Sequence, residues 1–296
     1  MIRIRFLVLF FSLSLTSSLS FSQAIKYRKY KEGEKFRYRL ITEAYNYEQF
    51  ASKTVSLSEH TVIKDSGYLS EQVIWLSKRL FTPKDTANLD STALQVQPYK
   101  ISLSRKGKVL LPKLTVPDMV GEITDLNTFY VAIAPALNAQ KLSLKNNIFQ
   151  NKEIRRGNFA DSINILYGTD CIQVTQRLIS SNRQYSIVET QFLPPTSACL
   201  EPLIDTIGKR IFDYPNNFQM IRAGANGKVN LFWGVEQFTI SSKIDNKTGQ
   251  IIEAEMINLL TLRMRYNATP DLKSYDAELP VTIRRVVRLE LLHLIQ

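Results

Sequence analysis

Histidine and cysteine are scarce in this chain of 296 residues, which has two of each. Most acid–base schemes centre on imidazole, and His60 and His293 lie in ordinary strand-like segments. The motifs HExxH and GxSxG and the glycine-rich phosphate loops are absent from the sequence as well. The sequence therefore leaves enzymatic activity undecided but favours a protein without it. We expect no catalytic residue, no cofactor and no metal ligand set.

The two cysteines, Cys171 and Cys199, are an even number. In an oxidising compartment this count predicts a disulfide. A bridge between these positions would stabilise the fold by roughly 3–4 kcal/mol in the chain-entropy account. Two independent buried thiols are the alternative.

Long apolar runs are also missing, except at the very start of the chain. Arg3 and Arg5 precede FLVLFFSLSL, and a hydroxyl-rich segment ends at Ser22. A charged region, a short apolar region and small residues near position 22 predict a signal peptide over residues 1–22. A membrane anchor is the alternative, but residues 6–21 include six Ser or Thr among 16 positions, and a spanning helix needs about 20 mostly apolar residues. We expect an exported, periplasmic or extracellular protein that does not span the membrane after cleavage.

Acidic residues are fewer than basic ones. The chain has 27 acidic and 38 basic residues, which give it a formal charge of +11. Removal of Arg3 and Arg5 with residues 1–22 leaves 11 − 2 = +9. The basic residues are spread along the chain, which favours solvated faces that keep the protein soluble. Contact with an anionic surface, such as lipid head groups, is the other interpretation. Nucleic acid is not an expected partner of an exported protein.

What the sequence does contain is alternation of apolar and polar residues. KFRYRLI, from Lys35, places aromatic and aliphatic side chains on one face and basic ones on the other. Residues 251–266 repeat the pattern over a length of about 50 Å at 3.3 Å per residue, far beyond a usual strand. The apolar face of that segment has these members: Ile252, Ala254, Met256, Leu260, Leu262 and Met264. A strand of this length predicts a large, curved sheet.

Turn residues separate the alternating segments. Residues 105–108, 226–227 and 245–249 have the composition of hairpin turns, so neighbouring strands should pair antiparallel. In VNLFWGVEQFTI, from Val229, the apolar positions change from odd to even near residues 234–237, which predicts a β-bulge. Further strands are expected from residues 55, 68, 162, 171, 183 and 281.

One segment departs from alternation. In residues 115–134 the apolar residues recur at spacings of three and four, as in an amphipathic helix; they are Met119, Ile123, Leu126, Tyr130 and Ile133. Thr115 is the expected cap and Pro135 the expected end. A shorter helix is expected over residues 201–207.

The predicted fold is mainly β: a long, curved antiparallel sheet or half-barrel with one amphipathic helix, about residues 115–134, packed on its concave face. Residues 23–296 should form a single β-rich body, because no linker rich in Pro, Gly or Ser divides them. Two lobes joined near residues 112–150 are the alternative.

Two polar residues interrupt apolar faces. Arg285 lies among the apolar residues of the last predicted strand, and Asn258 does so in residues 251–266. A buried cation or amide needs a partner, so both are candidates for polar contacts with a ligand. The alternatives are a bulge that turns Arg285 outward and a hydrogen bond from Asn258 to the backbone.

The expected export signal, long bent strands and inserted amphipathic helix together resemble the unclosed β-barrel with a helical lid of the periplasmic lipoprotein-carrier superfamily. The segment GEITDLNTFYVAIAP, residues 121–135, also resembles segments of exported bacterial β-rich proteins that have no established activity. Neither resemblance assigns a functional residue.

The favoured hypothesis is a non-enzymatic binding protein with an apolar groove for a lipid, an acylated protein or another hydrophobic partner. Leu126, Tyr130 and Ile133 would be shared between the core and the ligand, and Asn258 and Arg285 are the polar candidates. The alternative is a structural or interaction module of the cell envelope with a sealed core and no ligand.

Overall fold

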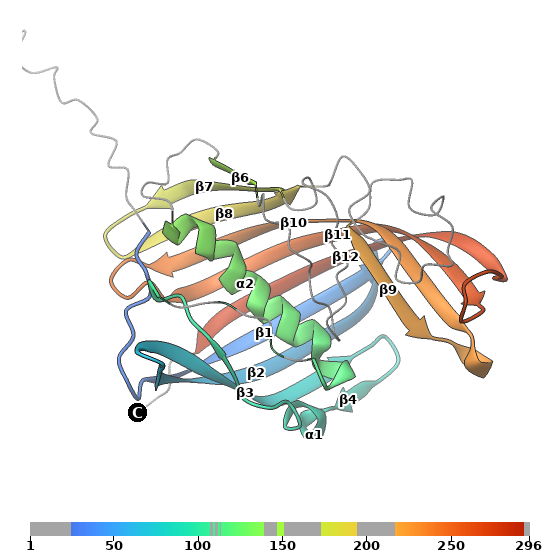
Figure 1. Ribbon diagram of the computed structural model, residues 1–296, viewed down its shortest axis with the longest axis horizontal. Coiled ribbons are helices and arrows are strands. Elements are labelled where there is room, and N and C mark those ends of the chain that lie inside the picture. The colour runs from blue at the N-terminus through green and yellow to red at the C-terminus, as the bar shows by residue number, and fades with distance from the viewer. Residues whose placement is uncertain are drawn as a thin grey trace, which may run out of the picture.

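A computed structural model of the chain describes residues 25–106, 109, 112, 114–138, 147–150, 173–193 and 217–292. Most of them are strands, with one long helix (Figure 1). The strands of the first half are β1 (Lys35–Asn46), β2 (Gln49–Asp65), β3 (Tyr68–Phe81), β4 (Thr86–Asn88), β5 (Tyr99–Ile101) and β6 (Asn147–Gln150). Those of the second half are β7 (Gln173–Ser181), β8 (Tyr185–Leu193), β9 (Phe218–Ala223), β10 (Val229–Asp245), β11 (Ile251–Ala268) and β12 (Ala277–Leu292). The helical elements are α1 (Asp90–Ala93), η1 (Pro117–Met119), α2 (Val120–Asn138) and η3 (Ala225–Gly227).

All these strands belong to one antiparallel sheet that is not closed. Their order is β4-β3-β2-β1-β12-β11-β10-β8-β7-β6, with β5 beside β3 and β9 beside β10. Most of the described strands that follow one another in the chain pair with each other, but β4 and β5, β5 and β6, and β8 and β9 do not. β1 pairs with β2 on one side and with β12 on the other. The predicted fold class, an open antiparallel sheet with one long helix packed against it, is confirmed.

The two faces of the sheet differ in chemistry. The inner face, which α2 covers, includes Tyr38 and Leu40 of β1, Met256 of β11 and Val287 of β12, all at most 2% exposed. The outer face presents cross-strand ion pairs to solvent, for example Arg39 with Glu290 and Arg288 with Glu255. The period-two pattern of the sequence thus separates an apolar side from a charged side.

The predicted bulge at residues 234–237 is wrong. The register between β10 and β11 continues without a shift from Leu231 to Lys243. Leu231 and Trp233 instead point to the outer face, where they pack with Ala268 and Leu272 in a second, small core. The apolar residues of β10 therefore change from odd to even positions because the outer face is covered at the start of the strand and the inner face is covered farther along it.

A register shift does occur where β10 meets the start of β11. Lys243 pairs with Glu253 and Ile244 pairs with Ile251, so Ile252 is the extra residue. Ile251, rather than Ile252 as the alternation predicted, belongs to the main core at 1% exposure.

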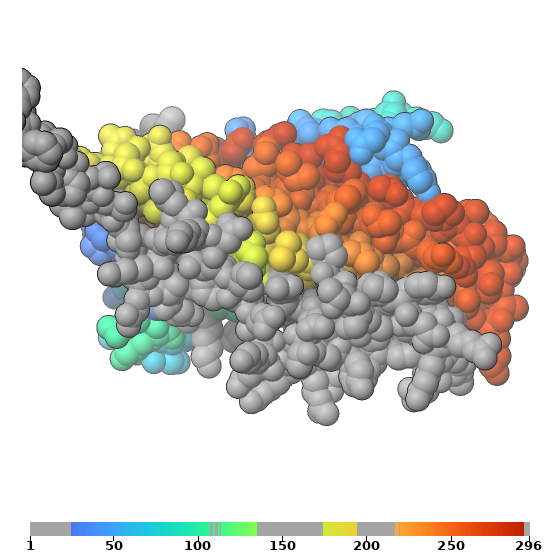
Figure 2. Space-filling model, turned by 90° about the horizontal axis from the view of Figure 1, so that it is seen from above, coloured from blue at the N-terminus to red at the C-terminus, as the bar shows by residue number. Residues whose placement is uncertain are grey.

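β10 changes its partner along one edge. β9 pairs with β10 as far as Gly234, and β8 pairs with it from Phe238 onward. In the gap, the side-chain amide of Asn217 accepts a hydrogen bond from the backbone N–H of Glu236 at 2.7 Å and donates one to its carbonyl at 2.9 Å. One side chain thus replaces a missing stretch of strand. Figure 2 shows β10–β12, in orange and red, extending well beyond the yellow pair β7 and β8.

The helix is longer than predicted, and its expected boundaries are wrong. The first turn is the 3₁₀ segment η1, capped by the backbone of Val116, so Thr115 is not its cap. Pro135 does not end the helix, because α2 continues to Asn138. A proline in a helix leaves the carbonyl four residues earlier without its donor, and that residue, Val131, is 52% exposed, where water can replace the lost bond.

The predicted stripe faces the core. Met119, Ile123, Leu126, Tyr130 and Ile133 are each at most 2% exposed. Burial of a large apolar side chain stabilises a fold by roughly 1.5–3 kcal/mol, so this stripe fixes α2 on the inner face. Figure 1 shows the helix crossing the strands diagonally.

Several predictions lie outside the described residues. They concern the signal peptide over residues 1–22, the helix over residues 201–207, the strand from residue 162, and both cysteines, Cys171 and Cys199.

Candidate functional site

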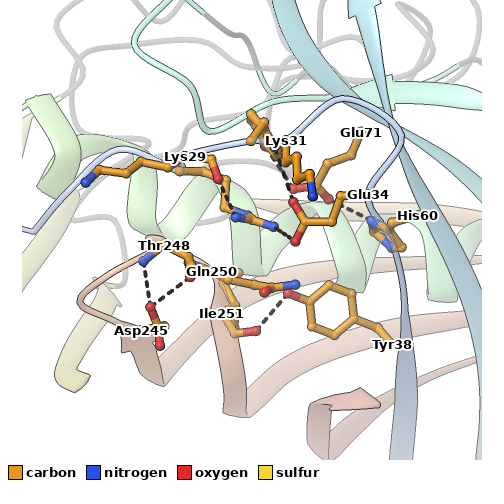
Figure 3. Close-up of polar contacts among 12 residues, drawn as sticks. Lys29, Lys31, Glu34, Tyr38, His60, Glu71, Asp245, Thr248, Gln250 and Ile251 are labelled. Atoms are coloured by element: carbon orange, nitrogen blue, oxygen red, sulfur yellow. Dashed lines mark hydrogen bonds and ion pairs between the residues drawn. The ribbon is translucent and has the colours of Figure 1, made fainter. Parts of the chain in front are cut away.

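A buried carboxylate joins three parts of the molecule near one end of the sheet. Oε2 of Glu71 on β3 accepts hydrogen bonds from the Tyr130 hydroxyl of α2 at 2.6 Å and from Nδ1 of His60 on β2 at 2.7 Å. Its Oε1 accepts a bond from the Tyr30 hydroxyl at 2.8 Å. We call these four residues the Glu71 cluster. Figure 3 shows Glu71 and His60 facing one another.

The carboxylate charge of the cluster is satisfied. Burial by itself raises the pKa of Glu71, but the bonds from His60, Tyr130 and Tyr30 outweigh it and hold this pKa below its usual value. His60 is 0% exposed and stacks between the Phe36 and Tyr130 rings. The buried His60–Glu71 contact joins β2 to β3.

The segment that supplies Tyr30, residues 25–31, is called the strap. Its backbone N–H groups at Arg28 and Lys29 donate to the carbonyls of Leu103 and Thr248. Gly249 allows this close approach, because a Cβ there would lie 2.8 Å from two strap carbonyls. The strap is therefore fixed to the segment after β5 and to the β10–β11 turn.

Farther along the inner face, polar residues form a belt across four strands. The guanidinium of Arg285 on β12 pairs with Asp125 of α2, and the hydroxyl of Thr42 on β1 donates to the same carboxylate at 3.2 Å. Beside Arg285 in the register, Asn258 on β11 donates from Nδ2 to Oε1 of Glu236 on β10 at 2.6 Å. These five residues are called the polar belt.

Two carboxylates of the polar belt lie in an environment that opposes their charge. Burial raises the pKa of Asp125 above its usual value, and the Arg285 guanidinium offsets only part of this effect. Burial likewise raises the pKa of Glu236, and within the described part of the chain its carboxylate accepts a hydrogen bond only from the amide of Asn258. Oδ1 of Asn258 is also buried and has no hydrogen-bond partner among the described residues.

Beyond the belt, the inner face becomes apolar. The register of β9 to β12 places these side chains on it in adjacent rows: Phe218, Met220, Phe232, Leu260, Leu262, Met264, Val281 and Ile283. Leu260 and Leu262 are 5% and 3% exposed, and the other six are half-buried. None of the eight belongs to the two hydrophobic clusters of the described residues. This surface is called the apolar half.

The candidate residues of the sequence occupy two different places. Leu126, Tyr130 and Ile133 lie in the packed core between α2 and the sheet. Asn258 and Arg285 lie together in the polar belt, each with a side-chain partner. Arg285 is not turned outward by a bulge, because its pairing with β1 and β11 has no register shift. Contact of these five residues with a ligand stays a prediction.

The sequence does not reveal the acidic partners of these sites. Glu71, Asp125 and Glu236 each lie on a buried surface, yet no sequence spacing connects them with His60, Arg285 or Asn258. The residues on the same side of β2 as His60, which are Ser56, Ser58 and Val62, are each at most 1% exposed, but two of them are serines, so the sequence contains no signal that this side is buried.

Within the described ranges, no group of three or more His, Cys, Asp or Glu side chains could hold a metal ion. The helices of this same part of the chain include none that is both long and apolar enough to cross a membrane.

Comparisons with known proteins assign no family. No family model matches the chain, and no curated protein does. Among solved structures, the chain is similar to a structure of lipovitellin that was reported for its lipid–protein interactions. The TM-score is 0.45 and the sequence identity is 10%. The match covers 90% of this chain but only 26% of that one. A likeness this distant says nothing about the activity of the present chain.

Proposed function

We propose that this protein is an exported, non-enzymatic binding protein that holds the apolar chain of a lipid or of an acylated partner against the apolar half of the sheet. The observation that carries the proposal is the set of eight apolar side chains from four neighbouring strands, which the two hydrophobic cores of the described residues do not include. Each methylene group transferred from water to such a surface contributes about 0.8 kcal/mol.

The composition of the apolar half suits a flexible ligand. It includes two methionines, Met220 and Met264, whose unbranched side chains adapt to different shapes. It also includes Phe218 and Phe232, which provide large contact areas. Such a surface favours a class of chains of varied length over one rigid molecule.

The polar belt would meet the other end of the ligand. The unpartnered Oδ1 of Asn258 can accept a hydrogen bond from a ligand hydroxyl or amide. Arg285, whose side chain is 24% exposed, lies in the adjacent row. A polar head group at the belt and an apolar chain over the apolar half would satisfy both surfaces.

The test uses the fluorescent fatty acid cis-parinaric acid and two variants, Met264→Glu and Ile283→Glu. Each places a carboxylate in the apolar half and should weaken probe binding at least tenfold, because an unpaired charge opposes a hydrocarbon chain. Ile257→Glu is the matched control, since Ile257 lies on the outer face of β11 and is 50% exposed. Equal affinity of all three variants would show that the chain binds elsewhere or not at all.

Export belongs to the same proposal and has its own measurement. The intact mass of protein recovered from outside the cytoplasm should correspond to removal of about 22 residues at the start. A full-length mass in that fraction would contradict the cleaved signal peptide.

A second candidate is a structural module of the cell envelope. The tight packing of Leu126, Tyr130 and Ile133 favours this candidate, because core packing alone is enough to explain why α2 lies on the sheet. Native mass spectrometry separates the two candidates, because a ligand carrier should copurify with bound lipid and a sealed module should not.

A further inference from the structure

One end of the sheet collects basic side chains from six separate segments. They are Lys26, Lys29 and Lys31 of the strap, Lys35 at the start of β1, Lys64 before the β2–β3 turn, Arg105 and Lys106 after β5, Arg183 in the β7–β8 turn and Lys247 in the β10–β11 turn. All nine are exposed. We call this surface the basic end.

Backbone contacts show that these segments share one end. Lys29 donates to Thr248, Arg28 to Leu103 and Gly33 to Val62. The N–H of Asn246 donates to the carbonyl of Gln184, which joins the β10–β11 and β7–β8 turns. Charges that are far apart in the sequence are therefore held on one surface.

Ion pairs within the described residues do not neutralise the positive charge of the basic end. None of its nine cations forms an ion pair with another described residue. Its acidic residues do not offset them: Glu34 pairs with buried Arg28, Asp65 with Lys100, and Asp245 accepts bonds from its own turn. Of the acidic residues in residues 25–35 and in the turns that carry the nine cations, Glu32 alone has no ion pair or hydrogen bond in the described part of the chain.

The rest of the surface behaves differently. On the outer face, cations pair across strands, as Arg37 does with Glu59 and Arg177 with Glu189. At the opposite end of the sheet, Lys228 pairs with Asp276 and Arg284 with Glu48. Among the other described cations, only Arg79, Lys84 and Arg222 have no ion pair, so most of the unpaired positive charge in this part of the chain lies at the basic end.

We propose that the basic end is a docking surface for an anionic lipid bilayer. Seven of the nine cations are lysines, which act as hydrated point charges and suit the diffuse field of a head-group layer better than the forked recognition of a single phosphate. Tyr27, in the strap, and Tyr68, at the β2–β3 turn, are half-buried at the same end, and tyrosine favours the boundary between water and lipid. This docking does not depend on a ligand in the apolar half.

The experiment compares sedimentation of the protein with vesicles of phosphatidylcholine alone and with phosphatidylglycerol added. We expect binding only to the anionic vesicles, and loss of binding at high salt. The triple variant Lys26→Gln, Lys29→Gln, Lys31→Gln should bind them roughly 100-fold more weakly, because each lysine near such a surface contributes about a factor of five. These side chains point away from the core, as Figure 3 shows for Lys29, so the melting temperature should not change.

The matched control removes the same charge elsewhere through Lys84→Gln, Lys228→Gln and Lys273→Gln, which lie toward the opposite end of the sheet. The control should keep most of the vesicle binding. Equal loss in both triples, or binding to neutral vesicles, would overturn the proposal. Preferential binding of heparin over anionic vesicles would also overturn it and assign the surface to a soluble polyanion. Binding of cis-parinaric acid should be unchanged in both triples, which separates this proposal from that of the apolar half.

Discussion

The hydroxyl of Tyr130 on α2 donates a 2.6 Å hydrogen bond to the buried carboxylate of Glu71 on β3. This bond fixes the helix to the strap end of the sheet by a directional contact, in addition to its apolar stripe. The same carboxylate accepts hydrogen bonds from His60 and Tyr30. A change at one donor therefore affects how the sheet, the helix and the strap are held together.

Tyr130→Phe should therefore destabilise the protein by about 1.5–3 kcal/mol, the usual range for a hydrogen bond to a charged group. Denaturant unfolding measures this loss. Tyr266→Phe is the control, because its ring is 44% exposed, and it should change stability by less than about 0.5 kcal/mol. Equal effects of the two variants would mean that Glu71 does not depend on Tyr130.

Arg285→Met leaves the buried carboxylate of Asp125 without its cation. We expect the free energy of unfolding to fall by about 3 kcal/mol at neutral pH. This is the lower end of the range for breaking a buried ion pair, because Arg285 keeps some contact with water. Adding Asp125→Leu should restore most of the stability. Because Asp125 is protonated at low pH, the cost of the single variant should shrink there. A cost that is the same at every pH would contradict the role assigned to this pair.

Glu236→Gln should stabilise the protein at neutral pH. The folded-state pKa of Glu236 lies above its usual value, so the folded protein binds this proton more tightly than the unfolded chain does, and stability falls as the pH rises through that folded-state pKa. Glutamine keeps the acceptor for Asn258 and removes the charge. Thermal unfolding should show a higher Tm, with about 2–4 °C for each kcal/mol gained. The gain should vanish below the ordinary pKa of glutamate, and a gain that persists there would have another cause.

Gly234→Ala tests the close approach of β10 and β11. Gly234 has a φ of +151°, and a Cβ there would lie 2.3 Å from the carbonyl oxygen of Thr261. The backbone would have to move, so we expect a loss of about 2 kcal/mol or more. Gly121→Ala, on α2, meets nothing within 4 Å and should stabilise the helix by about 0.5–1 kcal/mol. Calorimetry of the two variants should give shifts of opposite sign.

Local pattern was sufficient to predict much of this fold. The alternation in KFRYRLI and in residues 251–266 predicted β1 and β11, and the turn composition of residues 245–249 predicted the antiparallel pairing of β11 with β10. The three-and-four spacing from Met119 to Ile133 predicted α2. These features depend on residues a few positions apart, which a sequence displays directly.

Long-range contacts were not predictable in the same way. The sequence shows that Asn258 and Arg285 are polar residues in need of partners. Their partners, Glu236 and Asp125, become neighbours only through the sheet register and the placement of α2. The outer core around Leu231 and Trp233 also escaped prediction, because alternation does not show that both faces of a strand can be covered. Pro135 was misinterpreted for a related reason, since its effect depends on whether water reaches Val131.

The position of β12 has a consequence for how the chain assembles. β12 alone bridges β1 and β11, so the strands before it form two separate ribbons, one of β1–β4 and one built around β10 and β11. Until β12 is synthesised and inserted, each ribbon exposes a long unpaired edge that can associate with another copy. Nascent or truncated chains that stop short of residue 277 should therefore be the species that aggregate and that need a chaperone.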